Sequence, residues 1–366
     1  MYVIFPAALD NVACEPATCS CRRWLGVAAE RGRKRRARTG VKFPMPHAEA
    51  AMVGALLAGG DLPEGTVSLA GAWDGHPAYG WVTPDGVEMA FSTLCAEVRA
   101  RLASTDEPVA LATAEGGWRR PLQVFRFEGG APLIRLASQV DLDWSEFASL
   151  RDAALDLVAD RRHPLLARLA QVAALLAVVQ RDRAVPQHVP PLTSRAFLAF
   201  RGFLEARVAA ADAESMARFG AAMLPLMGAE TGLQATDAGR LLDTLNGDWR
   251  EQLRHRMVTE ESGLCSAIEA WLGVRVFALA LARDQTIARA TAELIDGFAQ
   301  GLRFAAALAE ITDRSVDPTL VVAALTLGEH HVAHAATPLP AFALPEGGHE
   351  RGPRMADLDM TLGSIC

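Results

Sequence analysis

Three cysteines in one short segment are the residues of this chain that suggest chemistry most directly. Cys14, Cys19 and Cys21 are separated by Glu, Pro, Ala, Thr and Ser, and Arg22 and Arg23 follow at once. Small and turn-forming spacers allow several sulfurs to converge on one point, so the thiolates could hold zinc or an iron–sulfur cluster. The positive charge of the adjacent arginines would favour the thiolate forms that metals bind.

A metal site needs a further ligand, because structural zinc sites and most clusters use four. Cys95 is the candidate, since it belongs to the same predicted domain. The spacing of the first three cysteines differs from the paired C-x2-C pattern of zinc ribbons. We therefore predict a metal site formed by Cys14, Cys19, Cys21 and Cys95, with an unmetallated loop as the alternative.

A second cluster lies near the end of the last predicted helix and consists of Glu329, His330, His331 and His334. His330 and His334 are four residues apart, the helical spacing that lets two imidazoles bind one metal. The H-E-x-x-H order of metalloproteases is missing. Histidines are also favoured near a helix C-terminus by the macrodipole and by capping of the last carbonyls. We interpret them as helix-end residues rather than metal ligands.

Several familiar catalytic motifs are missing from the sequence. No G-x-x-x-x-G-K-[ST] or G-x-G-x-x-G motif follows a predicted strand and opens a helix, which argues against ATP and dinucleotide binding. There is no G-x-S-x-G elbow, and the serines are too scattered to nominate a nucleophile.

Composition indicates a cytoplasmic protein. The chain has 366 residues and a net charge of −7, which gives no general attraction to nucleic acid. Six cysteines in so long a chain do not resemble the disulfide framework of a small secreted domain, so a reducing cytoplasm is predicted. The start has no basic segment of a signal peptide, and the apolar stretch at residues 169–179 is too short to span a membrane. The excess of arginine over lysine is typical of a GC-rich bacterial genome.

The pattern of the chain changes near residue 140. Residues 1–140 alternate short apolar runs with Gly- and Pro-containing turns, which predicts an α+β domain. We expect its strands near residues 66–70, 78–82, 109–113, 122–127 and 133–136, and helices near 47–57 and 91–103.

Helical periodicity then dominates residues 141–336, so the fold class is mainly α. Asp143 and Glu146 have the spacing of a capping box, a second helix follows Pro164, and Asp317 with Pro318 should open the last helix. Residues 337–366 are rich in Pro and Gly and are predicted to form an irregular tail.

The chain resembles the bacterial flagellin lysine N-methylase family in three stretches. The first is a cysteine-rich signature that ends in a tryptophan: Cys14, Cys19, Cys21 and Trp24. The second is a helical segment in which an arginine precedes a second helix with an Arg-Leu pair: Phe147, Leu150, Arg151, Asp160, Arg161, Pro164, Leu165, Arg168 and Leu169. The third is a final helix that ends in histidine: Val321, Val322, His330, His331 and His334.

The resemblance implies transfer of a methyl group from S-adenosylmethionine to lysine side chains of a protein or peptide, with cysteines that hold an iron–sulfur centre. An acidic chain would suit such a basic substrate. One cysteine of the family's first group is missing, and only Cys95 lies near the position of its second group. Two alternatives therefore stay open: a structural zinc site, and a non-catalytic helical protein that binds a peptide or protein.

Overall fold

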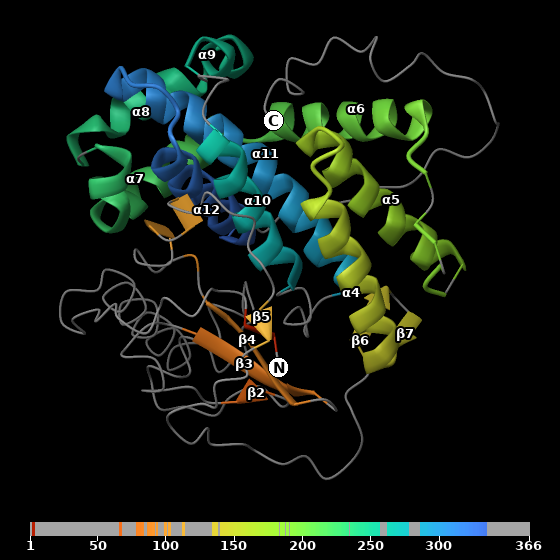
Figure 1. Cartoon of the computed structure of the whole chain (residues 1–366). Helices are drawn as coiled ribbons and strands as arrows, with labels where there is room; N and C mark the ends of the chain where they lie inside the picture. Colours follow the sequence, from red (N-terminus) through yellow and green to blue (C-terminus); the bar gives the residue numbers. More distant parts are fainter. Residues whose placement is uncertain are drawn as a thin grey trace, which may run out of the picture.

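The computed structural model of the chain describes most of residues 140–334 and short pieces before them (Figure 1). The gaps in this range are residues 183, 187, 190, 234, 257–261 and 278–285. The earlier pieces are residues 2–3, 66–67, 78–83, 86–91, 93, 99–100, 102–103, 112–113 and 134–137. Among the helices that the structure describes, none combines the length and the apolar character needed to cross a bilayer.

The described residues are mostly helical, which confirms the predicted fold class at that level. The helices, in chain order, are α4 (Trp144–Ala159), α5 (Leu165–Asp182), α6 (Ser194–Ala210), α7 (Ala213–Thr231), α8 (Ala238–Leu245), α9 (Trp249–Arg256), α10 (Ser262–Phe277), α11 (Ile287–Thr312) and α12 (Pro318–His334), with a 3-10 turn, η2, at Ala235–Asp237.

The ends of several helices follow the capping signals in the sequence. The Asp143 side chain accepts a hydrogen bond from the Glu146 backbone N–H at 2.8 Å, and the Glu146 carboxylate accepts from the Asp143 backbone N–H at 2.9 Å. This is the predicted capping box, and α4 begins directly after it. At α12, Asp317 accepts from the Leu320 backbone N–H at 2.8 Å, and Pro318 occupies the first helical position.

Short strands in the first half of the chain form a five-stranded sheet in the order β2-β3-β4-β1-β5. They are β1 (Tyr2–Val3), β2 (Thr66–Val67), β3 (Ala78–Thr83), β4 (Gly86–Phe91) and β5 (Ala112–Thr113). The pairing is antiparallel except between β1 and β4. A separate hairpin joins β6 (Ile134–Ala137) to β7 (Val140–Leu142).

The predicted α+β domain at residues 1–140 stays a prediction, because most of those residues lie outside the described part. The same holds for the tail at 337–366 and for the domain boundaries. The expected strand at 122–127 and the expected helix at 47–57 also fall on residues that are not described.

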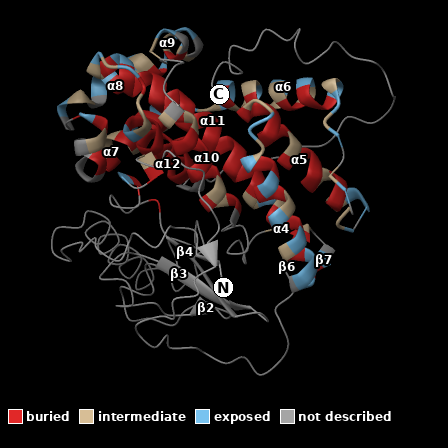
Figure 2. Cartoon of the chain, viewed as in Figure 1, coloured by how far each residue is buried: buried red, intermediate tan, exposed pale blue. Residues whose placement is uncertain are grey.

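Helix α11 lies at the centre of the helical part and packs most extensively against α12 (Figure 1). Nearly every residue of α11 from Thr291 to Ile311 is buried, polar ones included, and Figure 2 shows α10, α11 and α12 as the buried centre. Such a helix has no polar face for water and must satisfy its polar side chains through its neighbours.

Three glycines allow α11 and α12 to approach closely. A Cβ atom at residue 328 on α12 would lie 2.3 Å from the carbonyl oxygen of Gly297 and 2.3 Å from the amide nitrogen of Gly301, both on α11. Side chains at Gly297 and Gly301 would likewise come within 3.0 Å of the α12 backbone at Glu329 and Leu325. The two backbones therefore touch where their glycines meet.

Arg303 on α11 fixes the ends of two other helices. Its guanidinium donates to the carbonyl oxygens of Val208 and Ala211 at the end of α6, and to that of Leu245 at the end of α8. The last carbonyls of a helix have no partner within the helix, so a buried cation that meets them satisfies both groups. Arg207 on α6 also pairs with buried Asp296 on α11.

We predict that Gly328→Ala destabilises the protein by about 3 kcal/mol or more, because its methyl group would overlap the α11 backbone and force the helices apart. Gly202→Ala is the matched control: residue 202 lies on α6, and its added Cβ would meet no atom within 4 Å. This control should be stabilised by about 0.5–1 kcal/mol, since alanine is the better helix former. Urea unfolding followed by circular dichroism measures both. Equal midpoints for Gly328→Ala and the parent chain would contradict the close contact.

Candidate functional site

The four predicted metal ligands, Cys14, Cys19, Cys21 and Cys95, all lie outside the described residues. The metal site therefore stays a prediction. Within the part of the chain that the structure describes, there is no group of three or more His, Cys, Asp or Glu residues that could hold a metal ion.

Cys265 on α10 is disulfide-bonded. Its sulfur is therefore not a thiolate that could bind a metal. No local pattern predicts this bond, because Cys265 stands alone among its neighbours in the sequence.

A buried ion-pair cluster joins α4 and α5 to α10. The Glu269 carboxylate on α10 contacts Arg168 Nη1 on α5 at 2.6 Å and Arg161 Nη2, in the α4–α5 turn, at 2.7 Å. The side chains of Arg168 and Glu269 are 2% and 5% exposed. Arg168 also donates to the carbonyl oxygen of Val158 near the end of α4. This one carboxylate thus balances the buried Arg168 and connects three segments of chain.

A second buried pair lies near the other end of α10. Arg275 Nη1 is 2.9 Å from Glu329 Oε1 on α12, and the hydroxyl of Thr93 donates to Glu329 Oε2 at 3.3 Å. Glu269 and Arg275 lie on the same helix, so α10 connects the segment with Arg161 and Arg168 to the segment with Glu329 and the histidines. These are the second and third stretches of the resemblance to the methylase family.

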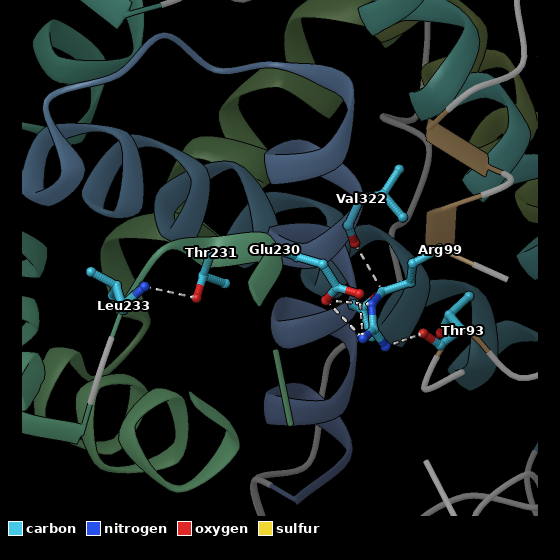
Figure 3. Close-up of polar contacts among 7 residues, drawn as sticks. Thr93, Arg99, Glu230, Thr231, Leu233 and Val322 are labelled. Carbon is cyan, nitrogen blue, oxygen red and sulfur yellow. Dashed lines mark hydrogen bonds and ion pairs between the residues drawn. The ribbon is translucent and has the colours of Figure 1, made fainter. Parts of the chain in front are cut away.

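Arg99 makes a further polar contact between the first part of the chain and the helices (Figure 3). Its guanidinium donates to both carboxylate oxygens of Glu230 at the end of α7, at 2.7–3.0 Å, and to the Thr93 carbonyl oxygen at 2.9 Å. Burial raises the pKa of Glu230, and the positive charge of Arg99 and its hydrogen bonds offset part of that rise.

Two histidines of the second sequence cluster, His330 and His331, are buried near the C-terminal end of α12. His330 is 1% exposed and His331 is 5% exposed. His331 Nδ1 lies 2.5 Å from Gln300 Oε1 on α11, and its Nε2 lies 3.0 Å from Ser215 Oγ on α7. His331 lies near the end of α12, and its ring also bonds side chains of two other helices. The side chain of His334 is outside the described part.

Sequence reasoning missed Glu269, Arg275, Gln300 and Ser215 as polar groups of the core. No local pattern in the sequence indicates these residues, because the partner of each one lies on a different helix and more than 30 residues away along the chain. The one available signal was a charged or polar residue on an otherwise apolar helical stripe, as at Glu269 beside Ile268 and Trp271.

Comparison with profiles of known families, with curated proteins and with solved structures gives no match to this chain.

We predict that Glu269→Ala lowers the free energy of unfolding by about 3–5 kcal/mol, because it leaves the buried Arg168 guanidinium without a counter-charge. The double variant Glu269→Leu/Arg168→Met should recover a large part of that loss, since apolar side chains can fill a buried ion-pair site. Asp182→Ala, which removes the exposed pair with Arg181, should change the urea midpoint little. If the double variant is no more stable than Glu269→Ala, the loss is not caused by the uncompensated charge.

The raised pKa of Glu230 predicts a pH dependence of stability. The folded protein keeps the Glu230 proton at pH values where the unfolded chain, with an ordinary value of 4.5, has lost it. The stability that this proton contributes is complete below pH 4.5 and is lost as pH rises through the folded-state pKa. Relative to Glu230→Gln, which cannot titrate, the parent chain should therefore become less stable across that window. Parallel urea titrations from pH 4 upward measure the difference, and a difference that is constant with pH would contradict the shift.

Proposed function

We propose that this chain is a lysine N-methyltransferase-like protein that takes S-adenosylmethionine and a protein or peptide substrate. The observation that carries the proposal is that the second and third stretches of the family resemblance both make ion pairs with buried or partly buried side chains of α10. Arg161 and Arg168 meet Glu269, and Glu329 meets Arg275. Residues that the resemblance singles out along the chain are thus joined through one helix in the core.

The acidic character of the chain supports the choice of substrate. A net charge of −7 favours a basic, lysine-bearing partner over an acidic one. S-adenosylmethionine would supply the methyl group. The protein's part would be to align a neutral lysine amine with the methyl–sulfur bond in a slot with little water.

The cysteine-rich segment is the proposed site of an iron–sulfur cluster or a zinc ion. Its three sulfurs, from Cys14, Cys19 and Cys21, together with that of Cys95, are the soft ligands that either group prefers. We assign no step of methyl transfer to this group, because none of its ligands lies among the described residues.

We expect the anaerobically purified protein to bind S-adenosylmethionine in isothermal titration calorimetry and to transfer a labelled methyl group to lysine-rich test proteins. Iron, zinc and acid-labile sulfide are measured on the same sample. The triple variant Cys14→Ser/Cys19→Ser/Cys21→Ser should lose its metal, whereas Cys366→Ser, which changes a cysteine far away in the sequence, should keep it.

The outcomes separate the proposed function from its alternatives. Stoichiometric zinc without sulfide indicates a structural zinc site. A folded, metal-free protein that does not bind S-adenosylmethionine overturns the methyltransferase proposal and favours a non-catalytic protein that binds a peptide or protein.

A further inference from the structure

Side chains from three helices form a continuous hydrogen-bonded row in the core. Ser215 lies in the first turn of α7, His331 near the end of α12, and Gln300 in the middle of α11. Ser215 Oγ is 3.0 Å from His331 Nε2, and His331 Nδ1 is 2.5 Å from Gln300 Oε1. His331 and Gln300 are buried, whereas Ser215 is partly exposed. The row thus runs from the interior to a residue that is partly exposed.

The Gln300 contact determines which nitrogen of His331 carries the proton. A carboxamide oxygen can accept a hydrogen bond but cannot donate one, so Nδ1 must be the protonated nitrogen. The lone pair of Nε2 then faces Ser215, whose hydroxyl donates to it. This is the order of groups that activates a serine: a nucleophile, a base within hydrogen-bonding reach, and a third group that fixes the base.

We propose that Ser215 is an acyl-accepting nucleophile for uncharged esters of apolar acids, with His331 as its general base and Gln300 as a positioning residue. The apolar preference follows from the neighbouring rings. Phe219 lies one turn beyond Ser215 on α7, is partly exposed, and meets the His331 ring edge-on at a centroid distance of 5.5 Å. Phe304 of α11 meets the same ring at 6.4 Å.

The reaction balances with groups already at the site. Ser215 Oγ forms a bond to the acyl carbon while its proton passes to His331 Nε2. The ester C–O bond then breaks, and the departing alkoxide takes that proton from His331 and leaves as the alcohol. Water later releases the acid by the same steps in reverse order.

The surroundings of Ser215 predict slow acylation and slow turnover. The backbone N–H groups of Glu214 and Ser215 donate to the Asp212 carboxylate at 3.2 and 3.1 Å, so they are already used and do not stabilise an oxyanion. The formation of a covalent adduct is therefore the appropriate measurement.

The test is labelling of the full chain with an alkyl fluorophosphonate, in which Ser215 Oγ bonds to phosphorus and fluoride leaves with the proton. We expect one adduct per chain by intact mass, located at Ser215 by peptide mapping. Ser215→Ala should abolish it, and His331→Gln should slow it roughly 100-fold, the usual contribution of a general base. Ser145→Ala is the matched control, because Ser145 also lies in a first helical turn but donates to Asp143. It should label at the parent rate.

Gln300→Glu tests the role of the third group. A carboxylate at this position would stabilise the imidazolium that forms during the reaction, so labelling should become faster, whereas Gln300→Leu should slow it. Folding of each variant is checked by circular dichroism, and urea-unfolded parent protein should not label. Absence of the Ser215 adduct in the folded parent chain, or an unchanged rate in folded His331→Gln, would overturn the proposal. Labelling requires no methyl donor, so its outcome is independent of the methyltransferase proposal.

Discussion

The contact between the backbones of α11 and α12 is the constraint on which the rest of the helical part depends. Gly328 meets Gly297 and Gly301 with no room for a side chain between them. This contact fixes the position of α12 on the most buried helix of the chain, and residues 329–331 follow directly. The polar groups at those positions are thus held against α10, α11 and α7, because the helix that carries them has little freedom to slide.

Buried arginines hold the outer helices to this centre. Arg303 meets the final carbonyl groups of α6 and α8, and Arg168 meets a carbonyl near the end of α4 together with Glu269. A guanidinium suits this role because its five N–H groups point in fixed directions and can serve several acceptors at once. Each such contact satisfies helix-end carbonyls that water cannot reach.

The same packing has two different consequences for chemistry. Where a carboxylate faces an arginine, as at Glu269 and Arg168, the two charges neutralise each other. Such a pair mainly determines the arrangement of the helices. Ser215, His331 and Gln300 instead form a hydrogen-bonded row that ends at a partly exposed residue. The proposed nucleophile belongs to this second arrangement.

Local patterns in the sequence determined the helical class, the capping box at Asp143 and Glu146, and the start of α12 after Asp317, because each depends on residues within one or two turns. Other contacts join residues that lie about 100 or more positions apart in the sequence, as Ser215 and His331 do, and Glu269 and Arg168. The sequence therefore did not indicate which serine could act as a nucleophile, and the histidines resembled ordinary helix-end residues. Only the packing of the helices decided which polar groups share the core, because the burial that brings such groups together depends on several helices at once.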